Sequence, residues 1–459
     1  MKRQLFITGG CVLLIIGWLS AFLMRAIPQQ NDYFYIIPAV LLGVAMGLLL
    51  KVLSPMRTAI VVAIMAIVAI VTVNHVYPRG KISISGFFKR MEAEIKKGEP
   101  VAVEVQSTNR SGPFASERIL STVADLRVQL FARLPGPVRM LAFDKKGRLY
   151  ASIPDLGAIY QLTDVDNDGF AEQPVLYHVG LDRPHGLLWS QNNLYVAETT
   201  RLLRVWDSDG DSQADSSEVL LDDLPDDGGH WTRSLALGAD GDLYLSIGSR
   251  CNACEEQDFR RATVLQVDPA TGDAKVYATG LRNAVGLTFS GDGKTLWASD
   301  NGRDMLGDDL PPDEINRLVA DGDYGWPQCY GKQIPDPELG NQSLCQQSIP
   351  AAVDLPAHSA PLGIVFGDNL KAPKTFQNSM YVAFHGSWNR STPTGYKLVR
   401  IPFDNGQLGE PKEFLFGWLE DGKAWGRPVA PVVGLDGALY LSDDRANAIY
   451  RISWNKQES

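Results

Sequence analysis

One short pattern recurs along the chain from about residue 134 and restricts the folds that it can adopt. Each copy has an apolar segment, a turn rich in Gly, Asp or Asn, and a second segment centred on an aromatic residue. Segments of this kind on either side of a tight turn predict a β-hairpin. The six copies cover residues 140–150, 186–195, 235–244, 286–297, 363–381 and 432–440.

A third apolar segment follows most of these hairpins. It lies at residues 202–205, 264–267, 315–318, 398–401 and 449–452. Repeats of roughly 45 to 60 residues, with about four strands each, are typical of the blades of a β-propeller. No helical period is visible after residue 100, which disfavours a parallel α/β fold. We therefore predict an all-β, six-bladed β-propeller over residues 126–459, in which one repeat is lengthened by an insertion around residues 329–345.

The N-terminal part has a different composition. Three apolar runs cover residues 5–24, 33–50 and 59–73, and each is close to the ~20 residues that cross a bilayer core. A cleaved signal peptide would explain only the first run. We predict that residues 1–78 form a membrane anchor of three transmembrane helices, followed over residues 79–125 by a linker with a short helix.

Basic residues in the short flanks of these runs set the expected orientation. Lys2 and Arg3 precede the first run, and Lys51 and Arg57 lie between the second and third, whereas Arg25 alone occupies the other short loop. The positive-inside rule then places the N-terminus in the cytoplasm. We expect the protein to lie in the cell inner membrane, in contact with lipid, with the propeller in the periplasm.

The cysteines agree with an exported domain. Of the five, Cys11 lies in the first apolar run, and the other four form two local pairs, Cys251 with Cys254 and Cys329 with Cys345. Local pairs in an exported domain predict two disulfides. Half a zinc site or a redox dithiol is the alternative for Cys251 and Cys254, although no second Cys-x-x-Cys or nearby His pair completes a zinc site.

The net charge of −10 excludes one class of partner. A protein that binds nucleic acid needs a basic stripe to neutralise phosphates, and the sequence has none. We therefore expect no nucleic acid partner.

In a repeat fold, residues that differ between equivalent positions carry the function. His185, His230 and His385 lie at strand ends, Arg282 and Asn283 come just before the fourth hairpin, and Arg427 comes just before the sixth. A single His near a strand end is more often structural. Several His and Arg residues at equivalent places in different blades converge on one pocket, however, and arginines there suit a ligand with several carboxylates.

Two acidic loops follow strands and are candidates for structural calcium. Their alternate carboxylates could converge on one cation. Gly is misplaced for an EF-hand, however, and no helices flank the loops, so a simple Asp/Gly turn between strands remains the alternative. The carboxylates are Asp164, Asp166 and Asp168 in the first loop, and Asp207, Asp209 and Asp211 in the second.

A series of motifs between residues 181 and 452 resembles a known family. The motifs are His230-Trp-Thr-Arg-Ser-Leu235, Gly248-Ser-Arg-Cys-Asn-Ala-Cys254, Gly280-Leu-Arg-Asn283, Ser299-Asp-Asn-Gly-Arg-Asp304, Asp313-Glu-Ile-Asn316, Tyr324-Gly-Trp-Pro327 and Gly426-Arg-Pro-Val429. In this order they resemble the sugar dehydrogenases that depend on pyrroloquinoline quinone (PQQ), a propeller family of soluble glucose, aldose and sorbosone dehydrogenases. The sorbosone-type branch is the most similar. The apolar N-terminal runs lie outside the resemblance.

The resemblance implies roles for individual residues. His230 matches the general base that takes the proton of a sugar hydroxyl while hydride passes to the quinone. Arg282 and Asn283 match the pair beside the substrate and the reactive carbonyl of the quinone. Gly302 and Arg303 match two residues whose backbone carbonyls hold the catalytic calcium. A neutral imidazole can accept a proton near pH 7, and calcium bound by oxygen ligands polarises a carbonyl.

Further residues complete the expected pocket. Arg427 matches a basic residue that binds a cofactor carboxylate, and we extend this role to Arg390. Asn301, His185 and His385 are additional candidates for the cofactor pocket, the two histidines having no counterpart role in the family. Glu314 and Tyr324 belong to a region that binds structural calcium in the family. The glucose-oxidising members use a lysine on the fifth blade, where this chain has Ser387-Trp-Asn-Arg390.

The predicted function is therefore oxidation of an aldose or a sorbosone-like sugar aldehyde, dependent on PQQ and calcium. A membrane quinone or a cytochrome is the expected electron acceptor. Two alternatives remain open, namely a non-catalytic extracellular binding propeller and a lactonase-like propeller that uses only calcium.

Overall fold

Each of the six predicted hairpins is an antiparallel strand pair in the structure, a computed structural model that describes residues 98–455. The predicted membrane anchor and the first part of the predicted linker lie outside the described residues. Between residues 98 and 455, no helix is both long and apolar enough to cross a membrane.

Four sheets are separate units of four or five strands, and each begins with a predicted hairpin. The first contains β4 (Leu141–Phe143), β5 (Leu149–Ile153), β6 (Ala158–Leu162) and β7 (Val175–Val179). The second contains β8 (Gly186–Ser190), β9 (Asn193–Ala197), β10 (Leu202–Trp206) and β11 (Ser216–Leu221). The third contains β12 (Leu235–Leu237), β13 (Leu243–Ile247), β14 (Thr263–Val267), β15 (Ala274–Thr279) and the short β19 (Gly322–Asp323). The fourth contains β16 (Ala284–Phe289), β17 (Leu296–Asp300), β18 (Asp313–Leu318) and β22 (Val353–Leu355).

The fifth sheet has eleven strands and holds two antiparallel groups of four. One group is β23 (Pro361–Phe366), β24 (Ser379–Phe384), β25 (Lys397–Asp404) and β27 (Lys412–Phe416). The other is β30 (Pro428–Val433), β31 (Leu439–Asp443), β32 (Ala448–Trp454) and β3 (Leu126–Arg133). Strands β2 (Ile119–Thr122) and β1 (Glu99–Glu104) join the two groups, and β26 (Gln407–Leu408) pairs with β25.

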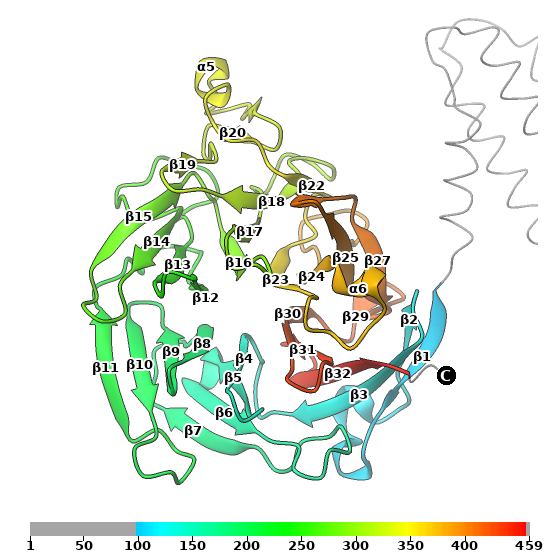
Figure 1. The fold of residues 1–459 in the computed structure, drawn as a ribbon. Coiled ribbons are helices and arrows are strands. Elements are labelled where there is room, and N and C mark those ends of the chain that lie inside the picture. Colours follow the sequence, from blue (N-terminus) through cyan, green and yellow to red (C-terminus); the bar gives the residue numbers. More distant parts are fainter. Residues whose placement is uncertain (1–97, 456–459) are drawn as a thin grey trace, which may run out of the picture. The chain divides into compact units, whose positions relative to one another are not determined.

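The sheets are arranged around a centre, and the first strand of each hairpin is the innermost one (Figure 1). These inner strands contact one another in the cyclic order β4, β8, β12, β16, β23 and β30, and β30 contacts β4 again. The ring closes where β3, from the start of the described chain, pairs with β32 from its end. The fold is therefore all-β and propeller-like.

The aromatic residue that recurs in the sequence pattern packs between neighbouring sheets. Tyr150 of β5 stacks on Trp189 of β8, with ring centroids 4.9 Å apart. Tyr440 of β31 meets Phe143 of β4 edge to face at 5.0 Å. Large rings at equivalent positions thus fill the wedge-shaped space between twisted sheets, which explains why the pattern repeats.

The structure differs from the sequence prediction over part of the linker. Strands β1 and β2 fall within residues 79–125, and both pair into the eleven-stranded sheet. Val103 and Leu120 are buried there, as is Phe114 between the two strands. The apolar alternation of β1 is short, and it is identified as a strand by its pairing with β2 and β3.

The predicted insertion lies between β18 and β22, at the outer edge of the ring (Figure 1). It contains β20 (Cys329–Tyr330), β21 (Ile334–Pro335) and α5 (Gln342–Cys345), whose N-cap is Asn341. The disulfide between Cys329 and Cys345 joins the ends of this insertion. Cys251 and Cys254 form the other disulfide, so both predicted pairs are confirmed. The remaining short elements are α6 (Lys374–Gln377), β28 (Leu419–Glu420), β29 (Lys423–Ala424) and the 3₁₀ helices Ser107–Asn109, Gly112–Phe114 and Pro154–Leu156.

Candidate functional site

The candidate residues gather at one end of the ring. In an antiparallel hairpin the start of the first strand and the end of the second lie side by side. His230, Arg282 and Arg427 precede inner strands, and His385 follows the second strand β24. We call the end of the ring that these residues occupy the mouth.

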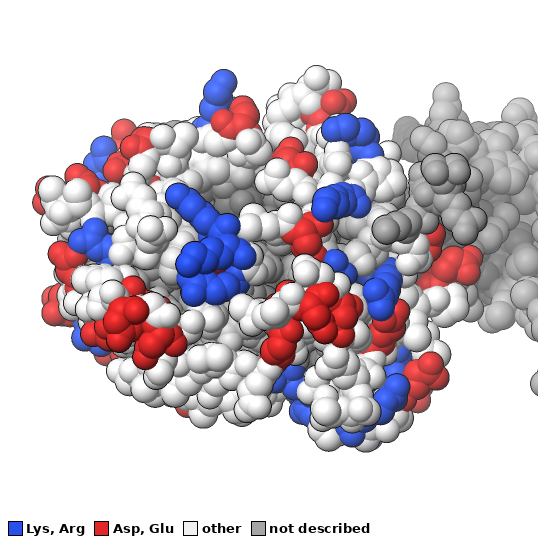
Figure 2. All heavy atoms as spheres, turned by 60° about the horizontal axis from the view of Figure 1, so that its bottom comes forward, with Lys and Arg blue, Asp and Glu red and all other residues white. Residues whose placement is uncertain are grey.

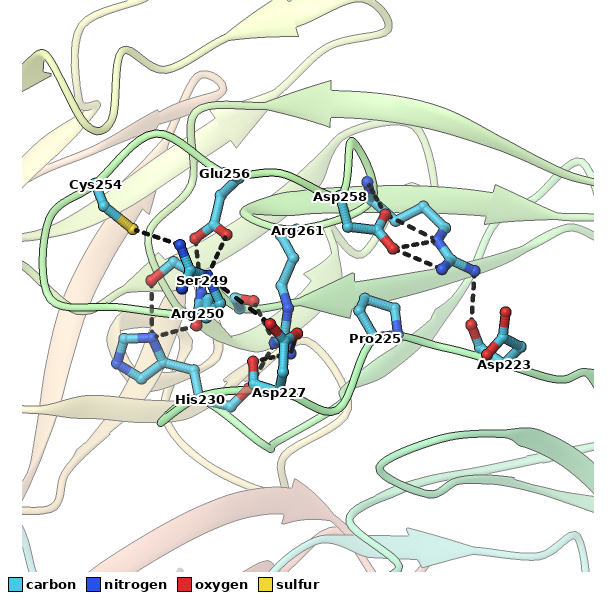
Figure 3. Close-up of polar contacts among 12 residues, drawn as sticks. Asp223, Pro225, Asp227, His230, Ser249, Arg250, Cys254, Glu256, Asp258 and Arg261 are labelled. Atoms are coloured by element: carbon cyan, nitrogen blue, oxygen red, sulfur yellow. Dashed lines mark hydrogen bonds and ion pairs between the residues drawn. The ribbon is translucent and has the colours of Figure 1, made fainter.

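His230 has a defined tautomer. Its Nδ1 lies 2.9 Å from the carbonyl oxygen of Ser249 and 2.9 Å from Ser249 Oγ (Figure 3). A carbonyl oxygen can only accept, so Nδ1 carries the hydrogen. The Ser249 hydroxyl donates its own hydrogen to the Cys251 carbonyl at 2.8 Å, and therefore also faces Nδ1 as an acceptor. Nε2 is left with a lone pair that can accept a proton.

The electrostatic surroundings keep His230 neutral. Burial, together with the positive charge of Arg282, lowers the pKa of this imidazole to about 3. Two buried arginines hydrogen-bond to the backbone around His230. Arg233 Nη1 donates to the His230 carbonyl at 3.1 Å, and Arg261 Nη1 donates to the carbonyl of the adjacent Gly248 at 3.2 Å. Arg261 also pairs with Asp227 at 3.0 Å (Figure 3).

Arg282 is buried beside His230 and is held on several sides. Its Nε donates to the Asn252 carbonyl at 2.9 Å, and its Nη2 donates to Asn252 Oδ1 at 2.9 Å and to Asp304 at 3.2 Å. Its Nη1 donates to the carbonyl of Asn301 at 3.1 Å. Burial lowers the pKa of Arg282, and the carboxylates of Asp304 and Asp300 oppose that shift.

Gly248 allows His230 and Asn283 to lie close together. A Cβ atom at this glycine would lie 2.6 Å from Asn283 Oδ1 and 2.7 Å from His230 Cβ, so no other residue fits without a shift. The structure thus brings together the three residues that the sequence predicts to be catalytic, namely His230, Arg282 and Asn283.

Four residues of the predicted calcium sites line one small cavity: Gly302 and Arg303, predicted to bind calcium through their backbone, and Glu314 and Tyr324, predicted to help bind structural calcium. Its volume is about 20 Å³, the scale of a single water molecule or ion. The lining includes Asn301, Gly302, Arg303, Glu314 and Tyr324, together with Arg282 and Asp300. The Arg303 side chain pairs with Asp336 at 2.7 Å, and Asp336 also lines the cavity.

Buried acids give this cavity a donor set that suits a hard cation. Burial raises the pKa of Glu314 to about 8 and that of Asp300 to about 7. Asn316 Nδ2 donates to Glu314 at 2.9 Å, while Asn316 Oδ1 is buried with no hydrogen-bond partner among the described residues. Carboxylate and carbonyl oxygens of this kind are the ligands that calcium prefers.

A charged network crosses the other side of the mouth. His385 Nε2 lies 2.9 Å from Asp444, and Arg139 Nη1 pairs with the same carboxylate at 2.7 Å. Arg427 donates to the carbonyls of His385 at 3.0 Å and of Gly386 at 2.6 Å. Burial lowers the pKa of His385 to about 4 against the opposing effect of Asp444.

His185 is fully buried, and its polar atoms are used within the protein. Its Nδ1 lies 2.8 Å from the Arg233 carbonyl, and its Nε2 lies 3.5 Å from Arg139 Nη2. Burial holds the pKa of His185 well below its usual range. His185 therefore contacts Arg233 and Arg139 and supports the residues of the mouth from within the protein.

The sequence analysis missed four residues of the mouth. The Arg183 guanidinium carbon lies 4.0 Å from the ring centroid of Trp231, and that of Arg139 lies 6.0 Å from it. A signal for Arg139 was present, because it precedes the first hairpin as Arg282 and Arg427 precede theirs. Asp444 is the other missed residue, and it follows the second strand of the last hairpin.

Arg390, which stays a predicted ligand of a cofactor carboxylate, contacts an acidic loop of the mouth in the structure. Its Nη2 pairs with Asp309 at 2.8 Å, and its Nη1 donates to the Asp308 carbonyl. Both acids belong to the loop between β17 and β18. The guanidinium therefore joins two loops of the mouth, and its described contacts do not include Arg427 or His385.

The two acidic loops follow the third strands β6 and β10, so they lie at the end of the ring opposite the mouth. Asp164, Asp166 and Glu172 gather in the first loop, without Asp168, and Asp207, Asp209 and Asp211 gather in the second. Their carboxylates accept hydrogen bonds from the loops' own amides, as an Asp/Gly turn requires.

Acidic side chains form compact groups beside basic ones on the face drawn in Figure 2.

The structure is thus an all-β, propeller-like ring of sheets with a buried imidazole, several arginines and a small acid-lined cavity at one end. The family profile described as TrAA12-like matches residues 121–455. The chain therefore belongs to the TrAA12-like family.

Solved structures agree with this fold. An AA12 carbohydrate-active enzyme from Trichoderma reesei, solved with iodide, superposes with a TM-score of 0.65 at 21% identity, over 73% of this chain and 98% of that one. The holo PQQ domain of pyranose dehydrogenase from Coprinopsis cinerea gives 0.62 at 21% identity, over 73% and 97%.

Curated relatives match over shorter stretches. An uncharacterised protein of Borreliella burgdorferi is 37% identical over 219 residues, which cover 47% of this chain and 58% of that protein. The PQQ-dependent pyranose dehydrogenase of Coprinopsis cinerea is 45% identical over 121 residues, or 21% of this chain and 15% of that protein. The resemblance to PQQ-dependent sugar dehydrogenases is thus confirmed, whereas the sorbosone-type branch stays a prediction.

Proposed function

We propose that this chain is a PQQ-dependent dehydrogenase that oxidises a sugar hydroxyl or a sugar aldehyde at the mouth of a six-bladed propeller. The observation that carries the proposal is the lone pair on Nε2 of a neutral His230, fixed beside Arg282 and Asn283. The family and its named relatives support the same class of reaction. The cyclic contacts of the inner strands support six blades if the eleven-stranded sheet is divided at β1 and β2.

The residues of the mouth fit a planar anion such as PQQ. Arg139, Arg183 and Arg427 offer guanidinium groups that can meet its carboxylates. The flat face of Trp231 lies among them. When bound, PQQ supplies the acceptor of a hydride.

The protein's own groups would handle the proton and the orientation of the substrate. Oxidation removes a hydride from carbon and a proton from a hydroxyl oxygen, which is that of the sugar alcohol or, for an aldehyde, that of its hydrate. We assign the proton to His230 Nε2, which would then be a cation held by the Ser249 carbonyl. The one N–H on Arg282 Nη1 that no described residue accepts would stabilise negative charge on the carbonyl oxygen of the hydride acceptor.

We propose that calcium binds the backbone carbonyls of Gly302 and Arg303, with Glu314 as the acidic ligand of the same cavity. Bound there, it would polarise the acceptor carbonyl and balance the buried acids. For the two acidic loops, calcium and a plain turn remain alternatives, and calorimetry with single-loop Asp→Asn variants separates them.

The test is an absorbance titration of the full-length protein with PQQ and calcium, followed by dye reduction over a panel of aldoses, sugar aldehydes and lactones. Saturable PQQ binding with dye reduction supports the proposal. Saturable binding without turnover on any sugar would identify a binding propeller. Lactone hydrolysis with calcium alone would identify a lactonase.

We further propose that residues 1–78 anchor the propeller on the periplasmic side of the inner membrane and favour delivery of electrons to a membrane quinone, directly or through a cytochrome. The three apolar runs and their basic flanks support this arrangement. The test compares oxygen uptake by membranes that hold either the full chain or an exported chain that begins near residue 98. Equal uptake at equal protein level would rule out a role for the anchor in electron transfer.

A further inference from the structure

The loop closed by the Cys251–Cys254 disulfide lies between the two side chains at the centre of the proposed reaction. Only Asn252 and Ala253 lie inside it. On one side the Cys251 carbonyl accepts from the Ser249 hydroxyl, which contacts His230 Nδ1. On the other side Asn252 contacts Arg282.

Asn252 joins two loops through its side-chain amide and its backbone carbonyl. Its Oδ1 accepts from Arg282 Nη2 at 2.9 Å and from the Asp304 backbone N–H at 2.7 Å. Its Nδ2 donates to the Asp304 carbonyl at 3.0 Å, and its own carbonyl accepts from Arg282 Nε at 2.9 Å. One side chain therefore locates Arg282 and the loop after β17 together.

The donors of Arg282 can be counted. A guanidinium has five N–H groups in a rigid fork. Asn252 accepts two of them, Asp304 accepts one and the Asn301 carbonyl accepts one. Within residues 98–455 one N–H on Nη1 is left for a ligand, and its direction is fixed by the contacts of the other four.

We propose that Asn252 is the positioning residue for Arg282, and that the Cys251–Cys254 disulfide serves to hold Asn252 and the Ser249 contact of His230 in place. The catalytic consequence rests on the proposed function, whereas the orientation of Arg282 does not. A disulfide that closes so short a loop removes little entropy from the unfolded chain. Instead, the disulfide restrains the positions of the Cys251 carbonyl and of Asn252, on which the orientations of His230 and Arg282 depend.

The experiment uses the full-length protein and four variants. N252A removes the side chain, and N252D keeps the oxygen acceptors for Arg282. The pair C251S/C254S opens the loop. N341A is the matched control, because Asn341 Oδ1 also accepts two hydrogen bonds but lies at the N-cap of α5 in the insertion.

Two readouts are taken from each variant. Turnover with PQQ, calcium and the best sugar of the panel is separated into kcat and KM. Labelling of Arg282 by phenylglyoxal, which attacks exposed guanidinium groups, is followed by peptide mass spectrometry on protein without PQQ. The second readout does not depend on any activity.

For N252A we expect kcat to fall by about 10- to 100-fold, because a shift of the supporting residue misplaces Arg282. Arg282 should be labelled faster than in the parent protein, and C251S/C254S should change both readouts in the same direction. N252D should lie between the parent and N252A, and N341A should match the parent in both. Labelling and kcat of N252A equal to those of N341A would overturn the proposal.

The two hypotheses can fail separately. Faster labelling of Arg282 in N252A, in a protein that shows no PQQ-dependent turnover, would reject the proposed function and keep the positioning role. An active parent whose N252A variant is unchanged in both readouts would reject the positioning role and keep the function.

Discussion

At the scale of single residues, the hydrogen bonds of His230 set what it can do. Its Nδ1 faces two oxygen atoms that must accept, so only Nε2 can take up a proton. The sequence showed this histidine at a strand end, but it could not show the tautomer. That property depends on the Ser249 carbonyl and hydroxyl, which come from the end of the neighbouring strand.

His230→Gln should therefore lose most turnover while it keeps PQQ binding. Glutamine keeps a polar group of similar size but cannot accept a proton, and general-base catalysis is typically worth about 10²- to 10⁴-fold. Stopped-flow or steady-state dye reduction, with PQQ affinity measured by titration, checks this. A rate equal to that of the parent would remove His230 from the mechanism.

The burial of His230 also determines how the rate should depend on pH. Since the pKa of His230 is lowered to about 3, the imidazole stays neutral well below the usual histidine range. The acid limb of kcat/KM should therefore lie below pH 5, in buffers from pH 4 to 8. A half-loss of kcat/KM near pH 6.5 would show that His230 titrates as an exposed histidine.

At the scale of elements, hairpins were predictable because local alternation and turn residues encode them. All six were found in the sequence, as were five of the six third strands, and β6 was the one missed. Arg139 and Asp444 were missed because they meet only where the last hairpin lies against the first. That contact depends on closure of the ring. Strands β1 and β2 were missed because they, too, are defined by contacts between distant parts of the chain, such as the pairing of β2 with β27.

The two disulfides should contribute differently to stability. Cys329 and Cys345 are 16 residues apart, and closure of a loop of about 15 residues is worth about 3 kcal/mol in the chain-entropy model. C329S/C345S should lower the free energy of unfolding by about this amount in denaturant titrations. C251S/C254S, which opens a loop with a separation of 3, should lower it less. The reverse order would contradict the entropic account.

At the scale of the whole molecule, the mouth is a polar centre enclosed by apolar sheet interfaces. Glu314, Asp300 and Asp313 are buried there, and burial raises the pKa of each, to about 8 for Glu314 and about 7 for the other two. Such groups stabilise the fold while they are protonated. The stability is present below the ordinary carboxyl pKa of about 4 and is lost as the pH rises through the raised values.

Calcium should therefore stabilise the protein more at pH 8 than at pH 5.5, because it binds the ionised carboxylates. At a calcium concentration 100-fold above Kd, the gain is about 2.7 kcal/mol. Thermal unfolding with calcium or with a chelator, at both pH values, measures it. Glu314→Gln should abolish most of the difference. An equal shift in Tm at both pH values would speak against these acids as ligands.

The pairing of β3 with β32 has a consequence for how the protein is made. Gln129 on β3 accepts a hydrogen bond from Arg451 on β32 at 3.0 Å, across 322 residues of chain. Ribosomes add about 5–20 residues per second, so β3 waits roughly tens of seconds for its partner. During that time β3 has an unpaired edge, the kind of surface on which strands from other chains add and aggregate. Closure of the ring depends on β32, the last of the described strands, and yield in the cell should depend on chaperones that cover the unpaired edge of β3.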